Sequence, residues 1–154
     1  MSRSVPLVSG VIDFHHCYEH YRPADGQERV HSGSLHVHPF YQLDLFPEGK
    51  TMVLIDGLPS IKTHSWSGLV IPPMVGHGYR SNRTALQVTF KFHIHPRYWF
   101  QFGRPDHAIR FPAVCEPLVR TLCHLGDRDP FLRDQQMLAI ITVCLVHWVR
   151  HCGT

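Results

Sequence analysis

Short segments in which hydrophobic and polar residues alternate fill the first two thirds of the chain. In residues 85–95, hydrophobic side chains occupy every second position from Leu86 to Ile94. Because successive side chains of a β-strand point to opposite faces, this pattern predicts a strand with one buried side. We expect the other side, which includes Thr89 and Lys91, to face solvent, since lysine is almost never buried without a partner.

Similar short segments are separated by turn residues. They cover residues 8–21, 36–49, 51–56, 61–66 and 69–71. Strands of this length with frequent turns favour an all-β sandwich or barrel over a regular alternation of strands and helices.

Helical periodicity replaces this alternation near the C-terminus. Hydrophobic residues at helical spacing predict a first helix over residues 117–125, with Pro117 in its first turn and Gly126 after its end. Asp129 is a suitable N-cap in front of Pro130, so we expect a second helix to run from there to about residue 151.

The second helix is hydrophobic around almost its whole circumference over residues 137–149. A helix that covers one side of a barrel needs an apolar stripe of only about 100°. Met137, Ile141, Cys144 and Trp148 recur at heptad-like spacing. Two interpretations stay open: these four residues pack against a symmetry mate, or they belong to a thick core within one chain.

Composition limits the class of protein. With 154 residues, 44% hydrophobic and 18% charged, the chain is expected to fold as a single globular domain. The formal net charge of +3 is spread along the chain, so we expect no DNA binding by this chain alone. The start of the chain has no long apolar run, and no segment reaches the roughly 18 apolar residues of a membrane span. We therefore expect a cytoplasmic protein.

Candidate chemistry lies in the segment over residues 36–49. In a regular strand, His36, His38 and Gln42 would share one face with Phe40 and Asp44. This face is a polar surface if one side of the sheet is in water, and a pocket if the strand belongs to a small barrel. In a pocket, the two imidazoles and the amide oxygen can converge on a metal ion.

A further histidine lies in a different context. His77 stands between Gly76 and Gly78, shortly after the two prolines that end a predicted strand. An isolated histidine at such a place is usually an exposed turn residue. Its distance along the chain from the His36 and His38 pair favours a role in the pocket.

These residues resemble the two cupin motifs. His36, His38, Gln42 and Gly49 have the spacing of the first motif, with Gln42 where metal-binding cupins usually have glutamate. The segment WSGLVIPPMVGHGY, residues 66–79, is similar to the second motif. Together with the helical tail, the chain resembles the N-terminal effector-binding and dimerisation domain of AraC-type transcription regulators.

The resemblance implies a mainly β fold. Residues 1–111 would form a small cupin barrel, a double-stranded β-helix or jelly-roll, and residues 112–154 a C-terminal two-helix hairpin of the same domain. The implied metal ligands are His36, His38, Gln42 and His77, holding a divalent ion such as Zn, Ni, Fe or Mn. Phe40, Asp44 and Tyr79 would contact the small-molecule effector.

Two functions follow from the resemblance. The first is a sensor domain that binds an effector in the barrel, forms a homodimer through the C-terminal helices, and reads DNA through a helix-turn-helix domain outside this chain. The alternative is a stand-alone metal-dependent cupin enzyme, an oxygenase or isomerase, with Asp44 or Tyr79 as the acid or base. We expect the sensor rather than the enzyme and assign no catalytic residue.

Overall fold

The computed structural model describes residues 3–4, 12–21, 29–30, 35–81, 84–94, 105–125 and 129–152. The described strands are β1 (Arg3–Ser4), β2 (Ile12–Tyr21), β3 (Arg29–Val30), β4 (Tyr41–Glu48), β5 (Thr51–Ile55), β6 (Ile61–Lys62), β7 (Ser67–Ile71), β8 (His77–Ser81), β9 (Leu86–Ile94) and β10 (Ile109–Arg110). The helices α1 (Cys115–Leu125) and α2 (Pro130–Cys152) follow. A mainly β fold with two C-terminal helices is therefore confirmed.

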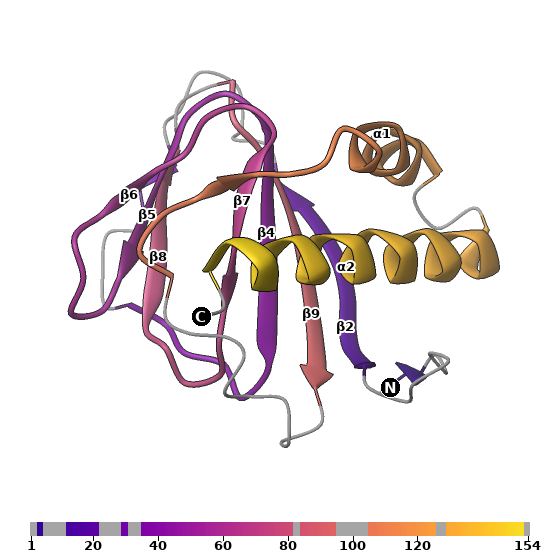
Figure 1. Cartoon of the computed structure of the whole chain (residues 1–154), viewed down its shortest axis with the longest axis horizontal. Coiled ribbons are helices and arrows are strands. Elements are labelled where there is room, and N and C mark those ends of the chain that lie inside the picture. The colour runs from indigo at the N-terminus through magenta and orange to yellow at the C-terminus, as the bar shows by residue number, and fades with distance from the viewer. Residues whose placement is uncertain are drawn as a thin grey trace.

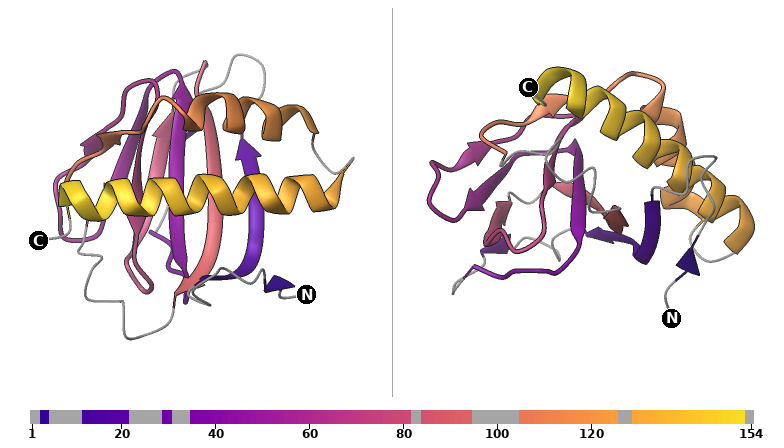
Figure 2. Two further views of the ribbon diagram at one scale, coloured as in Figure 1. Left: turned by 45° about the vertical axis from the view of Figure 1, so that its right-hand side comes forward. Right: turned by 60° about the horizontal axis from the view of Figure 1, so that its bottom comes forward.

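The strands form two antiparallel sheets. The six-stranded sheet has the order β1-β2-β9-β4-β7-β10, and the four-stranded sheet has the order β3-β8-β5-β6. The two helices lie across the outer side of the six-stranded sheet (Figures 1 and 2). In the part of the chain that is described, an isolated bridge between His36 and His77 is the only β-pairing outside the two ladders. A closed jelly-roll barrel is not formed by these residues.

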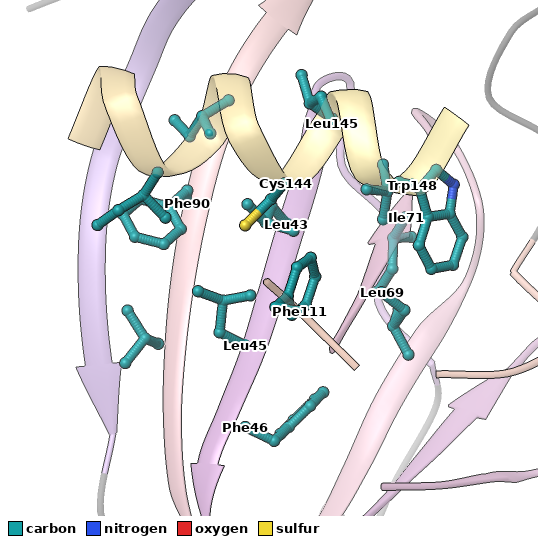
Figure 3. Packing of buried hydrophobic residues seen from close by; sticks show 14 of the residues in the cluster. Leu43, Leu45, Phe46, Leu69, Ile71, Phe90, Phe111, Cys144, Leu145 and Trp148 are labelled. Carbon is teal, nitrogen blue, oxygen red and sulfur yellow. The ribbon is translucent and has the colours of Figure 1, made fainter. Parts of the chain in front are cut away.

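Strand β4 is covered on both faces. Leu43 and Leu45 lie on the side of the sheet that the helices cover, where Cys144 of α2 lies beside Leu43 (Figure 3). Gln42 and Asp44 point the other way, toward the four-stranded sheet, and both are buried. The apolar side of this strand therefore packs under the helices, and its polar side lines the space between the sheets.

The same arrangement corrects the expectation for β9. Gln87 and Thr89 are only 4% and 7% exposed, so the predicted solvent-facing side is wrong for these two residues. Their side chains lie near Asp44, to which Thr89 Oγ1 donates a hydrogen bond of 2.8 Å. Lys91 is half-buried, with its Nζ 5.9 Å from the centre of the Phe40 ring. The alternating strand itself is confirmed, but alternation within β9 does not reveal that a second sheet covers the polar side.

The histidine segment is also shorter as a strand than predicted. β4 begins at Tyr41, so His36 and His38 precede it in an irregular segment that bends at Pro39 and Phe40. Residues 36–49 therefore do not form one continuous pleat. The imidazoles reach their places through backbone pairing with β8 instead of through strand alternation.

The helices begin close to the predicted positions. α1 begins at Cys115, two residues before the prediction, and α2 begins at Pro130. Asp129 caps α2, because its Oδ1 accepts a hydrogen bond of 3.0 Å from the Leu132 amide. Gly126, predicted to follow the first helix, lies outside the described residues. None of the helices described is long and apolar enough to cross a membrane.

Contacts within one chain explain why α2 is hydrophobic around almost its whole circumference. Met137, Ile141 and Cys144 are 0% exposed and Trp148 is 1% exposed, all through contacts of the same chain. Figure 3 shows Trp148 over the sheet beside Ile71. The thick-core interpretation is therefore confirmed, and the packing of these four residues against a symmetry mate is wrong.

Two buried free cysteines, one from each helix, lie next to each other in this core. The Sγ atoms of Cys115, the first residue of α1, and Cys144 lie 3.7 Å apart. Burial raises the pKa of Cys144 well above its usual range, while the hydrogen bond from Cys144 lowers the pKa of Cys115. Both behave as buried thiols that fill the core. The side chains of Cys17 and Cys152 lie outside the described residues.

Candidate metal centre

Three imidazoles meet between the sheets. His36, His38 and His77 each place a ring nitrogen so that the three atoms lie within 4.8 Å of one another. The ring centres are 4.2 Å apart for His36 and His77, 4.9 Å for His36 and His38, and 5.2 Å for His38 and His77. The three histidines predicted from motif spacing are therefore brought together.

Backbone hydrogen bonds hold His36 against the start of β8 and His38 against the turn before it. His36 and His77 exchange N–H···O bonds of 3.0 and 2.9 Å, and the Met74 amide donates to the His38 carbonyl at 2.8 Å. A Cβ on Gly78 would approach Leu35 Cδ2 at 3.3 Å, tighter than an ordinary contact. The small residue beside His77 therefore makes room for the segment that carries the other two histidines.

The tautomer of the neutral His77 ring follows from its hydrogen bond. The residue is 1% exposed, and its Nδ1 lies 2.9 Å from the Val75 carbonyl oxygen. A carbonyl only accepts, so Nδ1 carries the proton and Nε2 keeps its lone pair. That Nε2 is buried and has no hydrogen-bond partner among the described residues. A histidine that binds a metal through one nitrogen commonly donates the other N–H to a carbonyl in this way.

Gln42 presents a second orphaned atom. Its Nε2 donates to Asp44 Oδ1 and Oδ2, at 3.0 and 3.1 Å, and to the hydroxyl of Tyr79 at 2.6 Å. Its Oε1 is buried and has no partner in the described part of the chain. The ring centre of Tyr79 lies 5.8 Å from that of His77 and 6.2 Å from that of His36. The Gln42 amide is thus hydrogen-bonded to a residue that neighbours two of the imidazoles.

Asp44 is the centre of this hydrogen-bond network. Its carboxylate is 0% exposed and accepts from Tyr79 OH at 2.5 Å, Thr89 Oγ1 at 2.8 Å and Gln87 Nε2 at 3.3 Å, besides Gln42. A buried carboxylate is stable only when donors replace its water. Sequence reasoning missed Gln87 and Thr89, because Lys91 on the same side of β9 favoured a solvent-facing side.

The side chains present fit a divalent metal. Three imidazoles with an amide oxygen are ligands that Zn, Ni, Fe and Mn accept. Both orphaned atoms, His77 Nε2 and Gln42 Oε1, are electron-pair donors in a buried place. Phe40, a predicted ligand contact, stacks on His38 with ring centres 4.7 Å apart. Effector contacts by Phe40, Asp44 and Tyr79 stay predictions.

A separate hollow lies on the other side of the four-stranded sheet. It has a volume of about 460 Å³ and is lined by Lys50, Thr51, Met52, Lys62, Thr63, Arg80 and Ser81. Arg80, Met52 and Lys62 are paired in one row across β8, β5 and β6. Arg80 follows Tyr79 in the strand and therefore points away from the imidazoles. This basic hollow is not part of the metal centre.

Comparison with known proteins does not assign the chain to a family. No protein-family model matches the chain, and no curated protein matches it. Among solved structures, an RmlC-like cupin from Shewanella frigidimarina NCIMB 400 aligns with 59% of this chain and 82% of its own length. The sequence identity is 21% and the TM-score is 0.35. Similarity at this level assigns neither a family nor an activity to the chain.

Proposed function

We propose that this chain is a metal-binding cupin domain that senses a small-molecule effector, as the N-terminal domains of AraC-type regulators do. His36, His38, His77 and Gln42 would hold a divalent ion such as Zn, Ni, Fe or Mn. When bound, the ion supplies a Lewis acid that can anchor an oxygen-bearing group of the effector.

The observation that carries the proposal is the buried Nε2 of His77. It has no partner among the described residues, while the tautomer set by the Val75 carbonyl leaves its lone pair available. Leaving a buried polar atom without a hydrogen bond costs about 1–3 kcal/mol, which a ligated metal would offset. The adjacent imidazoles of His36 and His38 supply the remaining nitrogens.

The network around Asp44 favours sensing over catalysis. The alternative enzyme needs an acid or base next to the metal, and Asp44 and Tyr79 were its candidates. Tyr79 donates its hydroxyl proton to Asp44, whose carboxylate is filled by other donors and shielded from solvent. Both groups therefore serve the protein's own hydrogen bonds, which suits a rigid binding site better than proton transfer to a substrate.

Aromatic rings lie beside the imidazoles. Phe40 stacks on His38 with ring centres 4.7 Å apart, and the ring centre of Tyr79 is 6.2 Å from that of His36. A surface of imidazole and aromatic rings would suit a sugar, a small aromatic compound or an organic acid as the effector.

Metal binding is the first test. Protein stripped with a chelator and titrated with Zn²⁺ or Ni²⁺ by calorimetry should bind about one ion, and binding should raise the melting temperature. His38→Ala and His77→Ala should each weaken the affinity by more than roughly 100-fold, beyond the 10–100-fold typical of residues that only support a ligand. His124→Ala, on the exposed side of α1, is the matched control and should bind normally. Unchanged affinity in both site variants would contradict the proposal.

The regulator part of the proposal has its own measurement. The intact mass of the native gene product in its source cell should be near twice 17.8 kDa if a DNA-binding domain follows this chain. A native mass near 17.8 kDa would instead support the stand-alone metal-dependent enzyme.

A further inference from the structure

The Gln42 side chain is held in one orientation by its neighbours. Both hydrogens of its amide nitrogen are used, one toward the two oxygens of Asp44 and one toward the Tyr79 hydroxyl. Tyr79 cannot donate to Gln42, because its single hydrogen goes to Asp44. Turning the amide over would therefore place Oε1 against the Asp44 carboxylate, with only acceptors facing each other.

We propose that Asp44 is a positioning residue for Gln42. Its carboxylate makes glutamine, and not the glutamate usual in metal-binding cupins, the residue at position 42 that can bind the metal. This inference rests on the proposed metal centre. Asp44 fixes the nitrogen side of the Gln42 amide, so that Oε1 is directed away from the carboxylate and left as a donor for the metal.

A glutamate at position 42 does not fit this arrangement. In the same conformation, one of its oxygens would replace Nε2 and lie about 3 Å from both oxygens of Asp44. Two carboxylates that close cannot both be ionised without a large cost. Asp44 cannot turn away easily, since Thr89 and Gln87 hold its Oδ1 from β9. The residues at positions 42 and 44 are therefore coupled.

Four proteins test the coupling: the wild type, Gln42→Glu, Asp44→Asn and the double variant. In the double variant the amide and the carboxylate exchange places, so the new amide at position 44 can donate to the new carboxylate at position 42. We expect the metal-free melting temperature of each single variant to fall by at least about 4 °C and that of the double variant to lie closer to the wild type. Gln135→Glu, an exposed change of the same kind on α2, should have no effect.

Metal binding gives the second readout. Asp44→Asn and Gln42→Glu should each weaken Zn²⁺ binding roughly 10–100-fold, and the double variant should recover most of the loss. The visible absorption bands of bound Co²⁺ should change in Asp44→Asn well below its melting temperature. A purely structural role for Asp44 would leave the Co²⁺ bands unchanged.

Two outcomes would overturn the inference. The first is a Gln42→Glu variant that binds Zn²⁺ more tightly than the wild type at unchanged stability. The second is a double variant whose losses equal the sum of the losses of the two single variants. If the wild type binds neither Zn²⁺ nor Co²⁺, the proposed metal centre fails. The melting temperatures of the four metal-free proteins would still decide whether Asp44 and Gln42 are coupled.

Discussion

Burial raises the pKa of Tyr41 to about 12. The residue is 2% exposed, and its ring stacks on Phe92 of the neighbouring strand with ring centres 6.1 Å apart. Loss of water around the hydroxyl disfavours the charged phenolate, whereas an unfolded tyrosine titrates near pH 10. The folded protein therefore keeps the Tyr41 hydroxyl protonated at a pH where the unfolded chain has lost this proton.

Tyr41 should make the protein sensitive to alkali. Its folded pKa is raised, so its contribution to stability is complete below about pH 10 and is lost as the pH rises toward about 12. In that window the unfolded chain releases the proton first, and the free energy of unfolding should fall by about 1.4 kcal/mol per pH unit from this group. Urea unfolding of wild type and Tyr41→Phe at several pH values measures the two slopes. Equal slopes would contradict the assignment to Tyr41.

At the residue scale, motif spacing predicted the three imidazoles but not their support. His36 and His38 are recognisable by their spacing within one motif, and His77 by its place in a second motif at the expected distance along the chain. Asp44 was a candidate for effector contact, yet its structural partners Thr89 and Gln87 lie 45 and 43 residues away in sequence. Such partners depend on which strands become neighbours, and alternation within one strand carries no information on that.

At the scale of elements, the side chain of Asp129 caps the start of α2. Asp129 Oδ1 accepts from the Leu132 amide at 3.0 Å, and the Asp129 carbonyl accepts from the Arg133 amide at 2.9 Å. Asp129→Ala removes the side-chain acceptor and should cost about 1 kcal/mol of unfolding free energy. Urea denaturation followed by far-ultraviolet circular dichroism measures this loss.

The matched control for the cap is Asp129→Asn. Asparagine keeps an oxygen at the same position and is as good an N-cap as aspartate, so it should retain most of the stability. If Asp129→Ala and Asp129→Asn lose the same amount, the negative charge near the helix start, and not the hydrogen bond, is what stabilises α2.

Element boundaries were predictable where a local signal exists. The cap at Asp129 and the proline after it predicted the start of α2, and the structure confirms it. The start of β4 was missed, because the alternating pattern over residues 36–49 continues through two residues, Pro39 and Phe40, at which the backbone bends. The bend is held by pairing with β8, a contact that no local pattern announces.

For the whole molecule, the burial of Trp148 changes where a second copy could bind. The side of α2 that carries Met137, Ile141, Cys144 and Trp148 packs into the core of its own chain. On α2, Leu132, Ala139 and Val146 follow one another at intervals of seven residues, and Leu132 and Val146 are 39% and 49% exposed. We propose this exposed stripe, in place of the buried one, as the contact between two copies, because heptad spacing is what paired helices require.

The proposed contact between two copies can be tested without disturbing the core. Val146→Glu places a charge on the exposed stripe and should convert a dimer to a monomer in sedimentation equilibrium, with little change in the monomer's stability because the side chain is half exposed. His124→Glu, on the exposed side of α1, controls for the added charge and should stay dimeric. Trp148→Ala should instead cost about 3–5 kcal/mol of unfolding free energy by opening a cavity in the core. A wild-type protein that sediments as a monomer, or a Val146→Glu protein that stays a dimer, would place any contact between copies elsewhere.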